Sequence, residues 1–326
     1  MPPLKTVVFA DFLEETVVEA PILGDVARFV LAKARDEAEL VPHVAEADAL
    51  ILFHAVAGLG EATFSHAPKC KVVVRAGVGY NNVDLDAAAR HGVMVCNVPD
   101  YGTEEVADHA ILFLLAVARR LIPCHADIRA GGWHYDKAHG TPRLRGKTLG
   151  LIGCGRIGAA TSLRAKAFGL DVVFYDPYAQ EGTDKALGVR RVYDLNELLG
   201  QSHFVSLHCY LDEGTHHLIN AETLAAMRPG AVLINTARGG IVDQKALVEA
   251  LDSGHLAGAA IDVVEREPLD DDRLRYHPNV ILTPHSAFYS VESYIELRAK
   301  AAQEVRRVLL GEPPRNRVDH ARAKAR

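Results

Sequence analysis

Three short segments of the sequence place chemically capable side chains directly after apolar, β-branched runs. Residues 235–240 carry Arg238, residues 262–268 offer a carboxylate, and residues 283–287 carry His285. Ligands of open parallel sheets gather at the carboxyl ends of the strands, so these segments are expected to converge. A guanidinium can bind two oxygens at once, and an imidazole beside a carboxylate can deliver a proton near neutral pH. The set predicts acid–base chemistry on a 2-oxo or 2-hydroxy acid, and the alternative is a structural histidine with Arg238 in a surface ion pair.

A glycine-rich motif supplies a partner for that chemistry. Residues 149–152 are typical of an apolar strand, and a G-x-G-x-x-G pattern follows them and opens a helix. The first glycine permits a tight turn, the second lets the backbone approach a pyrophosphate, and the third lets helix and strand pack closely. In this context the pattern predicts a dinucleotide site, and the alternative is a glycine turn with no ligand. The residues of the motif are Gly153, Gly155, Arg156, Ile157 and Gly158.

The acidic residue Asp176 narrows the choice of cofactor. It ends the next predicted strand, 18 residues after Gly158. The dinucleotide fingerprint expects an acid about 20 residues on, where it binds the ribose 2′-hydroxyl. A carboxylate at this place repels a 2′-phosphate, and residues 177–180 contain no Arg or Lys. The sequence therefore predicts NAD rather than NADP.

Two successive series of strand–helix alternation must position these groups. Short apolar runs are typical of strands buried on both faces of a parallel sheet. A helix predicted at 103–120 and stopped by Pro123 separates the two series, and another at 290–310 closes the chain. Repeated β–α units indicate open parallel sheets covered by helices. The predicted strands are 7–10, 50–52, 72–74 and 93–96, then 148–152, 172–175, 204–207, 232–235, 259–262 and 280–282, and further predicted helices are 157–168, 221–227 and 244–253.

The composition excludes several classes of protein. The chain has 326 residues, enough for two domains, and its net charge of −6 is unfavourable for binding nucleic acid or an anionic membrane. Its five cysteines form no Cys-x-x-Cys pair, which argues against a zinc site or a disulfide framework and favours a reducing compartment. The N-terminus lacks a signal-peptide core, and the longest apolar run, residues 110–118, is about half of the ~20 residues that a bilayer needs. We expect a soluble, cytoplasmic protein with no metal, nucleic-acid or membrane partner.

These residues match a known family over nearly the whole chain, from about residue 6 to residue 311. The sequence resembles the D-isomer-specific 2-hydroxyacid dehydrogenases, and within them most closely the branch that contains the C-terminal-binding-protein corepressors. The stretches that carry the resemblance best are 95–99, 164–169 with 174–178, 235–243, and 284–285 with 289–290.

The resemblance implies a role for each member of the polar set. Arg238 would bind substrate, His285 would be the general acid/base, and Glu267 would be its partner. Glu267 rather than Glu265 fits the family position because it directly precedes Pro268. Family members that oxidise formate carry Gln in place of this Glu, so Glu267 counts against formate as the substrate.

The resemblance also implies binding residues. The loop 75–82 looks like the family's substrate loop, in which the backbone N–H groups of Val78 and Gly79 would cup a carboxylate and Arg75 would add positive potential. Asp262 would accept a hydrogen bond from the nicotinamide carboxamide. Further NAD contacts carry over to Cys209, Thr215, Thr236, Ala237 and Ala287.

Two departures from the corepressors favour a dehydrogenase. They have Trp where this chain has Phe288, and they continue into a long C-terminal region, whereas this chain ends at Arg326. An NAD(H)-sensing scaffold, in which cofactor occupancy controls assembly and partner binding, still fits the same polar set. A dehydrogenase of an unusual donor such as phosphite also keeps that set. A phosphoglycerate dehydrogenase with serine feedback is disfavoured, because no regulatory domain follows Gly311.

We therefore expect an α/β fold of two doubly wound parallel-sheet domains with a cleft between them. A Rossmann NAD domain would span residues 102–290, and a flavodoxin-like substrate domain would span residues 1–101, completed by 291–326. A small 2-oxo or 2-hydroxy acid would bind in the cleft. The expected activity is reversible hydride transfer between NADH and C2 of the D-isomer of such an acid. Because the family dimerises through its NAD domain, we expect a homodimer.

Overall fold

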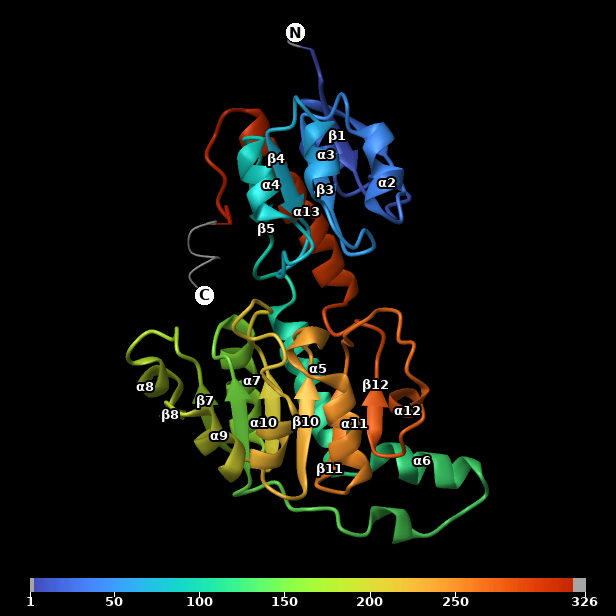
Figure 1. The fold of residues 1–326 in the computed structure, drawn as a ribbon, viewed down its shortest axis with the longest axis vertical. Helices are drawn as coiled ribbons and strands as arrows, with labels where there is room; N and C mark the ends of the chain where they lie inside the picture. Colours follow the sequence, from blue (N-terminus) through green and yellow to red (C-terminus); the bar gives the residue numbers. More distant parts are fainter. Residues whose placement is uncertain (1–2, 319–326) are drawn as a thin grey trace. The chain divides into compact units, whose positions relative to one another are not determined.

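The computed structural model describes residues 3–318, and the chain divides into two compact units. Unit 1 comprises Met1–Gly102 with Ser290–Arg326, and unit 2 comprises Thr103–Tyr289. In each unit a sheet of parallel strands lies between helices (Figure 1). Among the described residues, no helix combines the length and the apolar character needed to cross a membrane.

The sheet of unit 1 has five parallel strands in the order β2-β1-β3-β4-β5. This is the flavodoxin-like order, in which the direction of winding reverses between β1 and β3. The central strands β3 and β4 are buried throughout, as expected for continuous apolar runs, whereas the edge strand β2 is partly exposed. The strands are β1 Lys5–Phe9, β2 Ala27–Leu31, β3 Ala49–Leu52, β4 Val72–Arg75 and β5 Met94–Asn97.

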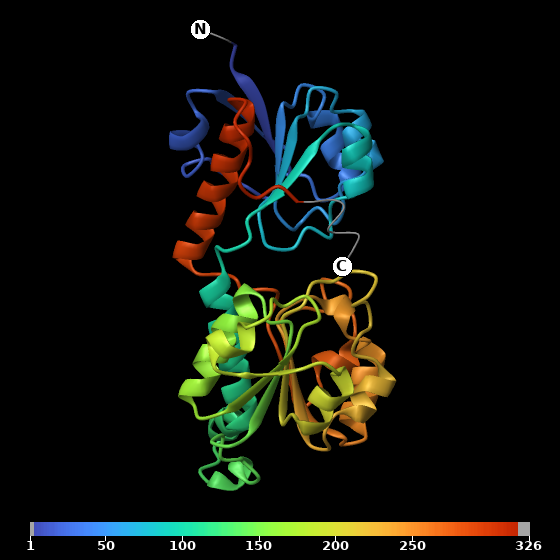
Figure 2. The same cartoon turned by 90° about the vertical axis from the view of Figure 1, so that its left-hand side faces the viewer.

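Helices cover both faces of this sheet (Figure 2). On one face the long helix α13 packs against β3, β4 and α1. The other face carries α2, α3 and α4, whose apolar side chains join those of the strands in one buried cluster. The helices are α1 Ala20–Leu23, α2 Glu37–Leu40, η1 Val41–His43, α3 Glu61–Ser65, α4 Leu85–Arg90 and α13 Val291–Leu309.

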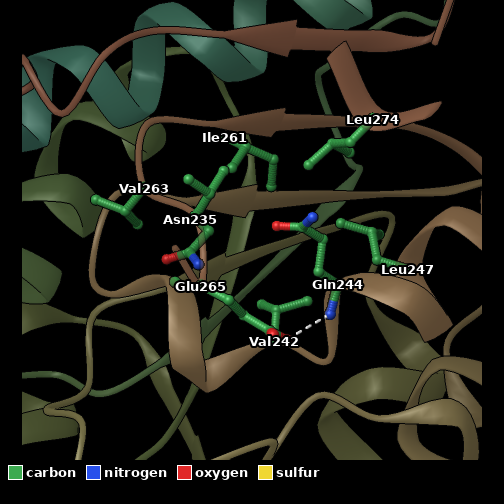
Figure 3. Close-up of a pocket in the computed structure, with 10 residues that line it drawn as sticks. Asn235, Val242, Gln244, Leu247, Ile261, Val263, Glu265 and Leu274 are labelled. Carbon is green, nitrogen blue, oxygen red and sulfur yellow. Dashed lines mark hydrogen bonds between the residues drawn. The ribbon is translucent and has the colours of Figure 1, made fainter. Parts of the chain in front are cut away.

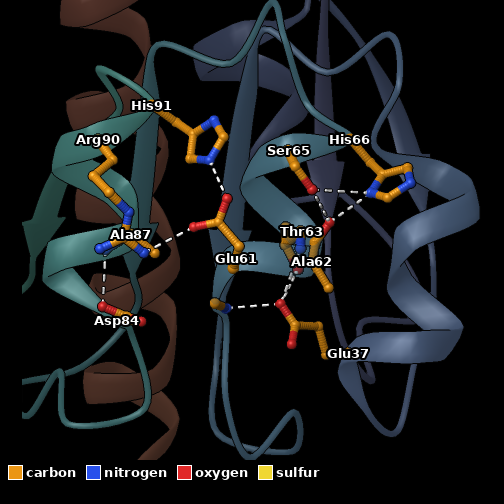
Figure 4. A network of polar contacts seen from close by, with 11 residues as sticks. Glu37, Glu61, Ala62, Thr63, Ser65, His66, Asp84, Ala87, Arg90 and His91 are labelled. Atoms are coloured by element: carbon orange, nitrogen blue, oxygen red, sulfur yellow. Dashed lines mark hydrogen bonds and ion pairs between the residues drawn. The ribbon is translucent and has the colours of Figure 1, made fainter.

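Polar side chains fix the short helices of unit 1 to one another (Figure 4). Glu37, at the start of α2, accepts hydrogen bonds from the backbone N–H of Gly60 at 2.7 Å and of Thr63 at 3.0 Å. It therefore satisfies N–H groups at the start of α3 that have no partner within the helix. Glu61 of α3 pairs with Arg90 at the end of α4. Helices this short have little stability of their own, so such contacts hold them in place.

The last described segment of the chain extends the sheet of unit 1 beyond β5. The backbone N–H of Val318 donates to the carbonyl of Val95 at 2.8 Å. The N–H of Asn97 donates to the carbonyl of Asn316 at 3.2 Å, and the pairing is antiparallel. This segment therefore covers the outer edge of β5.

The sheet of unit 2 has seven parallel strands in the order β12-β11-β10-β9-β6-β7-β8. Counted from β8 to β11 this is the Rossmann order, with β12 added at the far edge. The winding reverses between β6 and β9, which are hydrogen-bonded neighbours. The strands are β6 Thr148–Ile152, β7 Asp171–Tyr175, β8 Arg190–Val192, β9 Phe204–Leu207, β10 Ala231–Asn235, β11 Leu256–Ile261 and β12 Val280–Leu282.

Helices also form a layer on each face of this second sheet (Figure 2). One buried cluster joins the strands to α5 and α7, and another joins them to α9, α10 and α11. The helices are α5 Thr103–Ala118, α6 Leu121–Arg129, η2 Tyr135–Ala138, α7 Arg156–Ala167, α8 Thr183–Leu187, α9 Leu195–Gln201, α10 Ala221–Ala226, η3 Gly239–Ile241, α11 Gln244–Asp252 and α12 Asp272–Arg275.

The predicted fold class is confirmed, and three local details differ from the prediction. The sequence pattern does not predict β2 and β8, because both are edge strands with arginines and incomplete burial. The helix predicted at 103–120 ends at Ala118, before Arg120 with its left-handed φ of 51°. Pro123 lies in the first turn of α6 instead of ending α5. Proline is tolerated there because the first turn needs no N–H donor.

Candidate active site

The glycine motif forms the tight turn between β6 and α7. Gly153 has a φ of 93°, and a Cβ at this position would lie 2.7 Å from the backbone of His208 and Cys209. A Cβ on Gly158 would lie 2.3 Å from the carbonyl oxygen of Gly153. Both positions therefore require glycine. The turn stands at the reversal point between β6 and β9, where open parallel sheets bind their ligands.

Asp176 lies at the end of β7, where it holds the same turn. One carboxylate oxygen accepts the backbone N–H of Cys154 at 2.9 Å, and the other accepts that of Tyr178 at 2.9 Å. A carboxylate has about four lone-pair sites, so these two bonds leave room for a ribose hydroxyl. The structure thus fixes the acid of the fingerprint beside the glycine turn.

Other predicted cofactor residues fit a dinucleotide. No atom lies within 4 Å of an added Cβ at Gly155, so the turn is open on that side. Arg156 and Ile157 begin α7, exposed and half-buried respectively. The hydroxyl of Thr236 is buried and has no hydrogen-bond partner among the described residues. A buried polar atom without a partner is costly, and a bound cofactor would supply one.

The remaining predicted cofactor residues lie on the loops after β9, β10 and β12. Thr215 closes the loop after β9 by donating its hydroxyl to the carbonyl of Tyr210 at 2.6 Å, and Cys209 is half-buried at the start of that loop. Ala237 follows β10 and is half-buried. Ala287 follows β12 and is buried. All three loops leave carboxyl ends of the sheet of unit 2.

The three predicted catalytic residues come together in unit 2. The Nδ1 atom of His285 lies 2.8 Å from Oε2 of Glu267. The side chains of His285 and Glu267 are 26 % and 40 % exposed, so both reach solvent. His285 has a φ of 51°, a left-handed backbone that is uncommon outside glycine. Such an outlier is consistent with a side chain held for function.

Charges around Glu267 determine its protonation. Burial by itself would raise the pKa of Glu267, but the hydrogen bond and charge of His285 act against it. The N–H of Val264 and the charge of Arg238 act in the same direction, and the pKa is lowered. Glu267 is therefore an anion at neutral pH, with the side chains of His285 and Arg238 near it.

The turn that carries Arg238 is held by its neighbours. Asn235 at the end of β10 accepts the N–H of Ala237 at 3.0 Å and donates to the carbonyl of Arg238 at 2.9 Å. A Cβ on Gly239 would lie 1.9 Å from the backbone of Val264, so this turn and the loop that carries Glu267 are in direct contact. Arg238 and Glu267 therefore keep a fixed relation.

Glu265, the second candidate carboxylate, has a different partner. Its Oε1 accepts the backbone N–H of Gln244 at 2.8 Å and lies 3.1 Å from Nε2 of His217. It also lines a small pocket beneath the Arg238 turn, together with Asn235 and Val242 (Figure 3). Neither Arg238 nor the pair formed by Glu267 and His285 lines this pocket. The pocket therefore lies among residues that pack against the Arg238 turn and not among the candidate catalytic residues.

In unit 1 the predicted substrate loop follows β4. The guanidinium of Arg75 donates to the carbonyl of Ala76 at 2.9 Å, and the side chain is only 8 % exposed. A Cβ on Gly77 would lie 1.5 Å from this guanidinium, so the loop needs glycine there. Val78 is half-buried, and its carbonyl accepts from Asn97. Gly79 follows it and is buried.

Around Asp262, a predicted cofactor residue, the structure adds side chains that the sequence pattern does not indicate. Asp262 is buried, and its carboxylate binds the backbone N–H groups of Ser286 and Ala287, at 2.9 Å and 3.0 Å. Thr283 donates its hydroxyl to the same carboxylate and lies 3.1 Å from His109 of α5. A single histidine within an apolar helix carries no signal that could have identified it. In the described part of the chain, no group of three or more His, Cys, Asp or Glu side chains could hold a metal ion.

Comparisons with known proteins agree with this geometry. The model of the family described as D-isomer specific 2-hydroxyacid dehydrogenase, NAD binding domain, matches residues 111–287. The chain is 38% identical to C-terminal-binding protein 1 of Caenorhabditis elegans over 309 residues, which are 92% of this chain and 42% of that protein. It is 37% identical to D-3-phosphoglycerate dehydrogenase of Methanocaldococcus jannaschii over 313 residues, 96% of this chain and 59% of that protein. The chain thus spans about half the length of these two curated relatives.

A solved structure extends the likeness to three dimensions. The D-lactate dehydrogenase of Aquifex aeolicus, in complex with NAD and lactic acid, superposes with a TM-score of 0.85 at 29% identity. The match covers 94% of this chain and 96% of that one. The family predicted from the residues is confirmed, and so is NAD as the cofactor. The chain belongs to the D-isomer-specific 2-hydroxyacid dehydrogenases, a family of NAD-binding oxidoreductases.

Proposed function

We propose that the protein catalyses reversible hydride transfer between NADH and C2 of a small 2-oxo or 2-hydroxy acid of the D series. The observation that carries this proposal is the contact of 2.8 Å between His285 and Glu267, with Arg238 beside it. A histidine that donates one ring nitrogen to a carboxylate is held in one tautomer, and its other nitrogen can exchange a proton.

Each residue of the set has a defined role in this proposal. Arg238 binds the substrate carboxylate and carbonyl oxygen with its planar guanidinium, which orients C2. Bound NADH supplies the hydride. As charge develops on the carbonyl oxygen, Nε2 of His285 donates a proton to it, and in the oxidation direction Nε2 accepts that proton. Glu267 keeps Nδ1 protonated and stabilises the imidazolium.

In unit 1 the loop after β4 is proposed to bind a carboxylate. The backbone N–H groups of Val78 and Gly79 would donate to it. Arg75 would act through its charge, because its guanidinium already donates to the carbonyl of Ala76. Replacement of Gly77 by Ala should therefore weaken substrate binding, since a Cβ there would lie 1.5 Å from Arg75.

Asp176 supports a preference for NADH over NADPH. Its carboxylate is fixed beside the glycine turn by two backbone N–H groups, at 2.9 Å each. A fixed negative charge there repels a 2′-phosphate and accepts from a 2′-hydroxyl. Thr236 and Gly155 supply a buried hydroxyl and an open backbone for the same cofactor.

The direct test is NADH consumption across a panel of 2-oxo acids, from glyoxylate to branched and aromatic members, with NADPH in parallel. Turnover of one of them with NADH preferred is the expected result, and the best substrate defines the size of the side-chain pocket. Silence across the panel, with NADH binding intact, contradicts the proposal. It would instead favour an NAD(H)-sensing scaffold, or a dehydrogenase of an unusual donor such as phosphite.

The cysteines support the predicted reducing compartment. The five cysteines are free thiols. Burial raises the pKa of Cys70, Cys96 and Cys154 to about 12. Buried neutral thiols are unreactive, and free thiols without disulfides are typical of proteins in reducing compartments. We therefore extend the proposal to a cytoplasmic location.

We also propose that the protein is a homodimer and that unit 2 carries the contact. Helix α6 has no buried residue, although Leu121, Ile122 and Ile128 within it are apolar. Trp133, between α6 and η2, is 87 % exposed. Exposed apolar side chains of this kind are typical of a protein interface.

The oligomeric state tests this proposal. Trp133 is the single tryptophan of the chain, so its fluorescence reports on this surface alone. Sedimentation should show a dimer, and dilution should shift the Trp133 emission to longer wavelength as the dimer dissociates. An Ile128→Glu variant should be monomeric. A monomeric wild-type protein at micromolar concentration contradicts the proposal.

A further inference from the structure

A chain of hydrogen bonds runs from the helix layer of unit 2 to the turn that carries His285. It begins at His109 on α5, whose Nε2 lies 3.1 Å from the hydroxyl oxygen of Thr283. Thr283 donates that hydroxyl to Oδ1 of Asp262. A threonine hydroxyl has one proton, so it can only accept from His109 once it donates to Asp262. Nε2 of His109 is therefore the protonated nitrogen.

Asp262 in turn accepts hydrogen bonds from the backbone of the turn that carries His285. Its carboxylate is 3 % exposed and binds the N–H groups of Ser286 at 2.9 Å and of Ala287 at 3.0 Å. Its own backbone carbonyl accepts the N–H of His285 at 2.8 Å. The backbone N–H groups of three consecutive residues, 285–287, thus donate to one buried aspartate. A buried carboxylate is held in one geometry only while its hydrogen bonds are complete.

The ring of His109 is itself fixed. It lies edge-on to Phe113, one turn further along α5, with ring centroids 4.4 Å apart. Burial lowers the pKa of His109, although the charge of Asp262 acts in the opposite direction. A neutral ring with the proton on Nε2 is the form that can donate to Thr283 and leave the charge on Asp262.

We infer that His109 is a positioning residue of the reaction: through Thr283 and Asp262 it sets the position of His285 and Ala287. The inference rests on the proposed function, because it assigns His285 the proton transfer. His109 does not touch the reacting atoms. It acts by keeping the left-handed turn at His285, with its φ of 51°, in one geometry. Small displacements of a catalytic group are costly to the rate.

The test compares His109→Phe, Thr283→Val and the double variant with the wild type. His109→Phe keeps a ring against Phe113 and removes the donor, and Thr283→Val keeps the shape and removes the hydroxyl. Each single variant should lower kcat about tenfold with KM for the 2-oxo acid changed less than about twofold, because the lost interaction acts in the transition state. Since both changes break one chain, the double variant should be no more than about twofold slower than the singles.

Controls separate this role from a general loss of stability. Thr283→Ser restores the hydroxyl and should restore kcat. His203 is another half-buried histidine of unit 2, where its ring accepts the N–H of Thr148 at 3.1 Å. His203→Phe should lower the melting temperature. It should leave kcat within about twofold, because His203 does not belong to the chain of hydrogen bonds that holds the turn at His285. Wild-type kcat in either His109→Phe or Thr283→Val, or multiplied losses in the double variant, overturns the inference.

A readout without substrate keeps this test distinct from that of the proposed function. In the protein alone, the ring resonances of His285, assigned with a His285 variant, should shift in both His109→Phe and Thr283→Val. The ring resonances of His203 should stay in place. Absence of turnover in the wild type would reject the proposed function, whereas unmoved His285 resonances would reject the inference.

Discussion

Two histidine–glutamate pairs in unit 2 have their glutamates on one loop, and we propose a catalytic role for only one of them. Glu267 lies 2.8 Å from His285, and Glu265, two residues earlier, lies 3.1 Å from His217. Both histidines have left-handed backbones, with φ of 51° and 49°. Residue type and backbone conformation therefore do not distinguish the two pairs.

The surroundings of the two pairs differ. Glu265 also accepts the first N–H of α11, from Gln244, and the N–H of His217 donates to the carbonyl of Gly240 at 2.9 Å. This pair therefore joins three backbone segments. The pair of His285 and Glu267 has the charge of Arg238 beside it. The comparison teaches that the two pairs differ in their neighbours: a second charge acts on Glu267, whereas Glu265 also caps the first turn of α11.

The largest expected effect comes from one substitution made in both pairs. Asparagine tolerates a left-handed backbone, so His285→Asn and His217→Asn remove the imidazole with little backbone strain. His285→Asn should lower kcat about 1,000-fold, because the general acid acts in the transition state, while NADH binding by fluorescence stays intact. His217→Asn should stay within about twofold of wild type, as expected for a group outside the reaction. Similar kcat values for the two variants would remove the distinction.

A smaller loss is expected when Glu267, the carboxylate of the proposed catalytic pair, is neutralised. Glu267→Gln retains the shape but no longer stabilises the imidazolium, so kcat should fall about 100-fold. Glu265→Gln, two positions earlier, is the matched control and should leave kcat nearly unchanged. Steady-state kinetics measure kcat for both variants and for the wild type. An equal loss in the control would mean that the loop, and not the carboxylate of Glu267, limits the rate.

The melting temperature at acid pH should also depend on the pair of Glu267 and His285. The pKa of Glu267 is lowered from its ordinary value of 4.5, because its hydrogen bond and the neighbouring charges outweigh burial. Its ionised form therefore contributes stability above that ordinary value, and the contribution is lost as the pH falls through the lowered pKa. The difference in melting temperature between wild type and Glu267→Gln should shrink as the pH falls below about pH 4.5. A difference that grows below about pH 4.5 would contradict this sign.

The smallest effect is expected on the stability contributed by Glu265. Partly exposed ion pairs contribute at most about 1 kcal/mol, so Glu265→Gln should reduce the free energy of unfolding by no more than that. Urea unfolding measures it. A loss of several kcal/mol would show that the three segments joined at Glu265 form a single cooperative element.

The sequence predicted most of the fold and left the finer choices of the site to the structure. The continuous apolar runs of β3, β4 and β10 identify buried parallel strands without ambiguity. The edge strands β2 and β8 escape the same rule, because their outward residues are arginines and partly exposed side chains. The glycine motif is visible in the sequence because a close backbone approach requires glycine. Asp176 is visible because it lies at about the spacing that the dinucleotide fingerprint expects.

The choice between Glu265 and Glu267 shows where residue types fail. Both glutamates stand on one loop after β11, and each has a histidine partner distant in the sequence. Only the resemblance to a family favoured Glu267. The chain from His109 to Asp262 is further out of reach, because its members lie on α5 and on the loops after β11 and β12, and a hydrogen bond across 174 residues leaves no local pattern.

The segment that pairs with β5 has a consequence for the protein outside its own fold. A free sheet edge presents unpaired N–H and C=O groups to which a strand of another molecule can add. In unit 1 the backbone at Asn316 and Val318 already occupies that edge, and Arg315 and Arg317 place positive charge along it. Charged edges resist strand addition. The segment after α13 thereby withholds this edge of β5 from strand addition by another molecule.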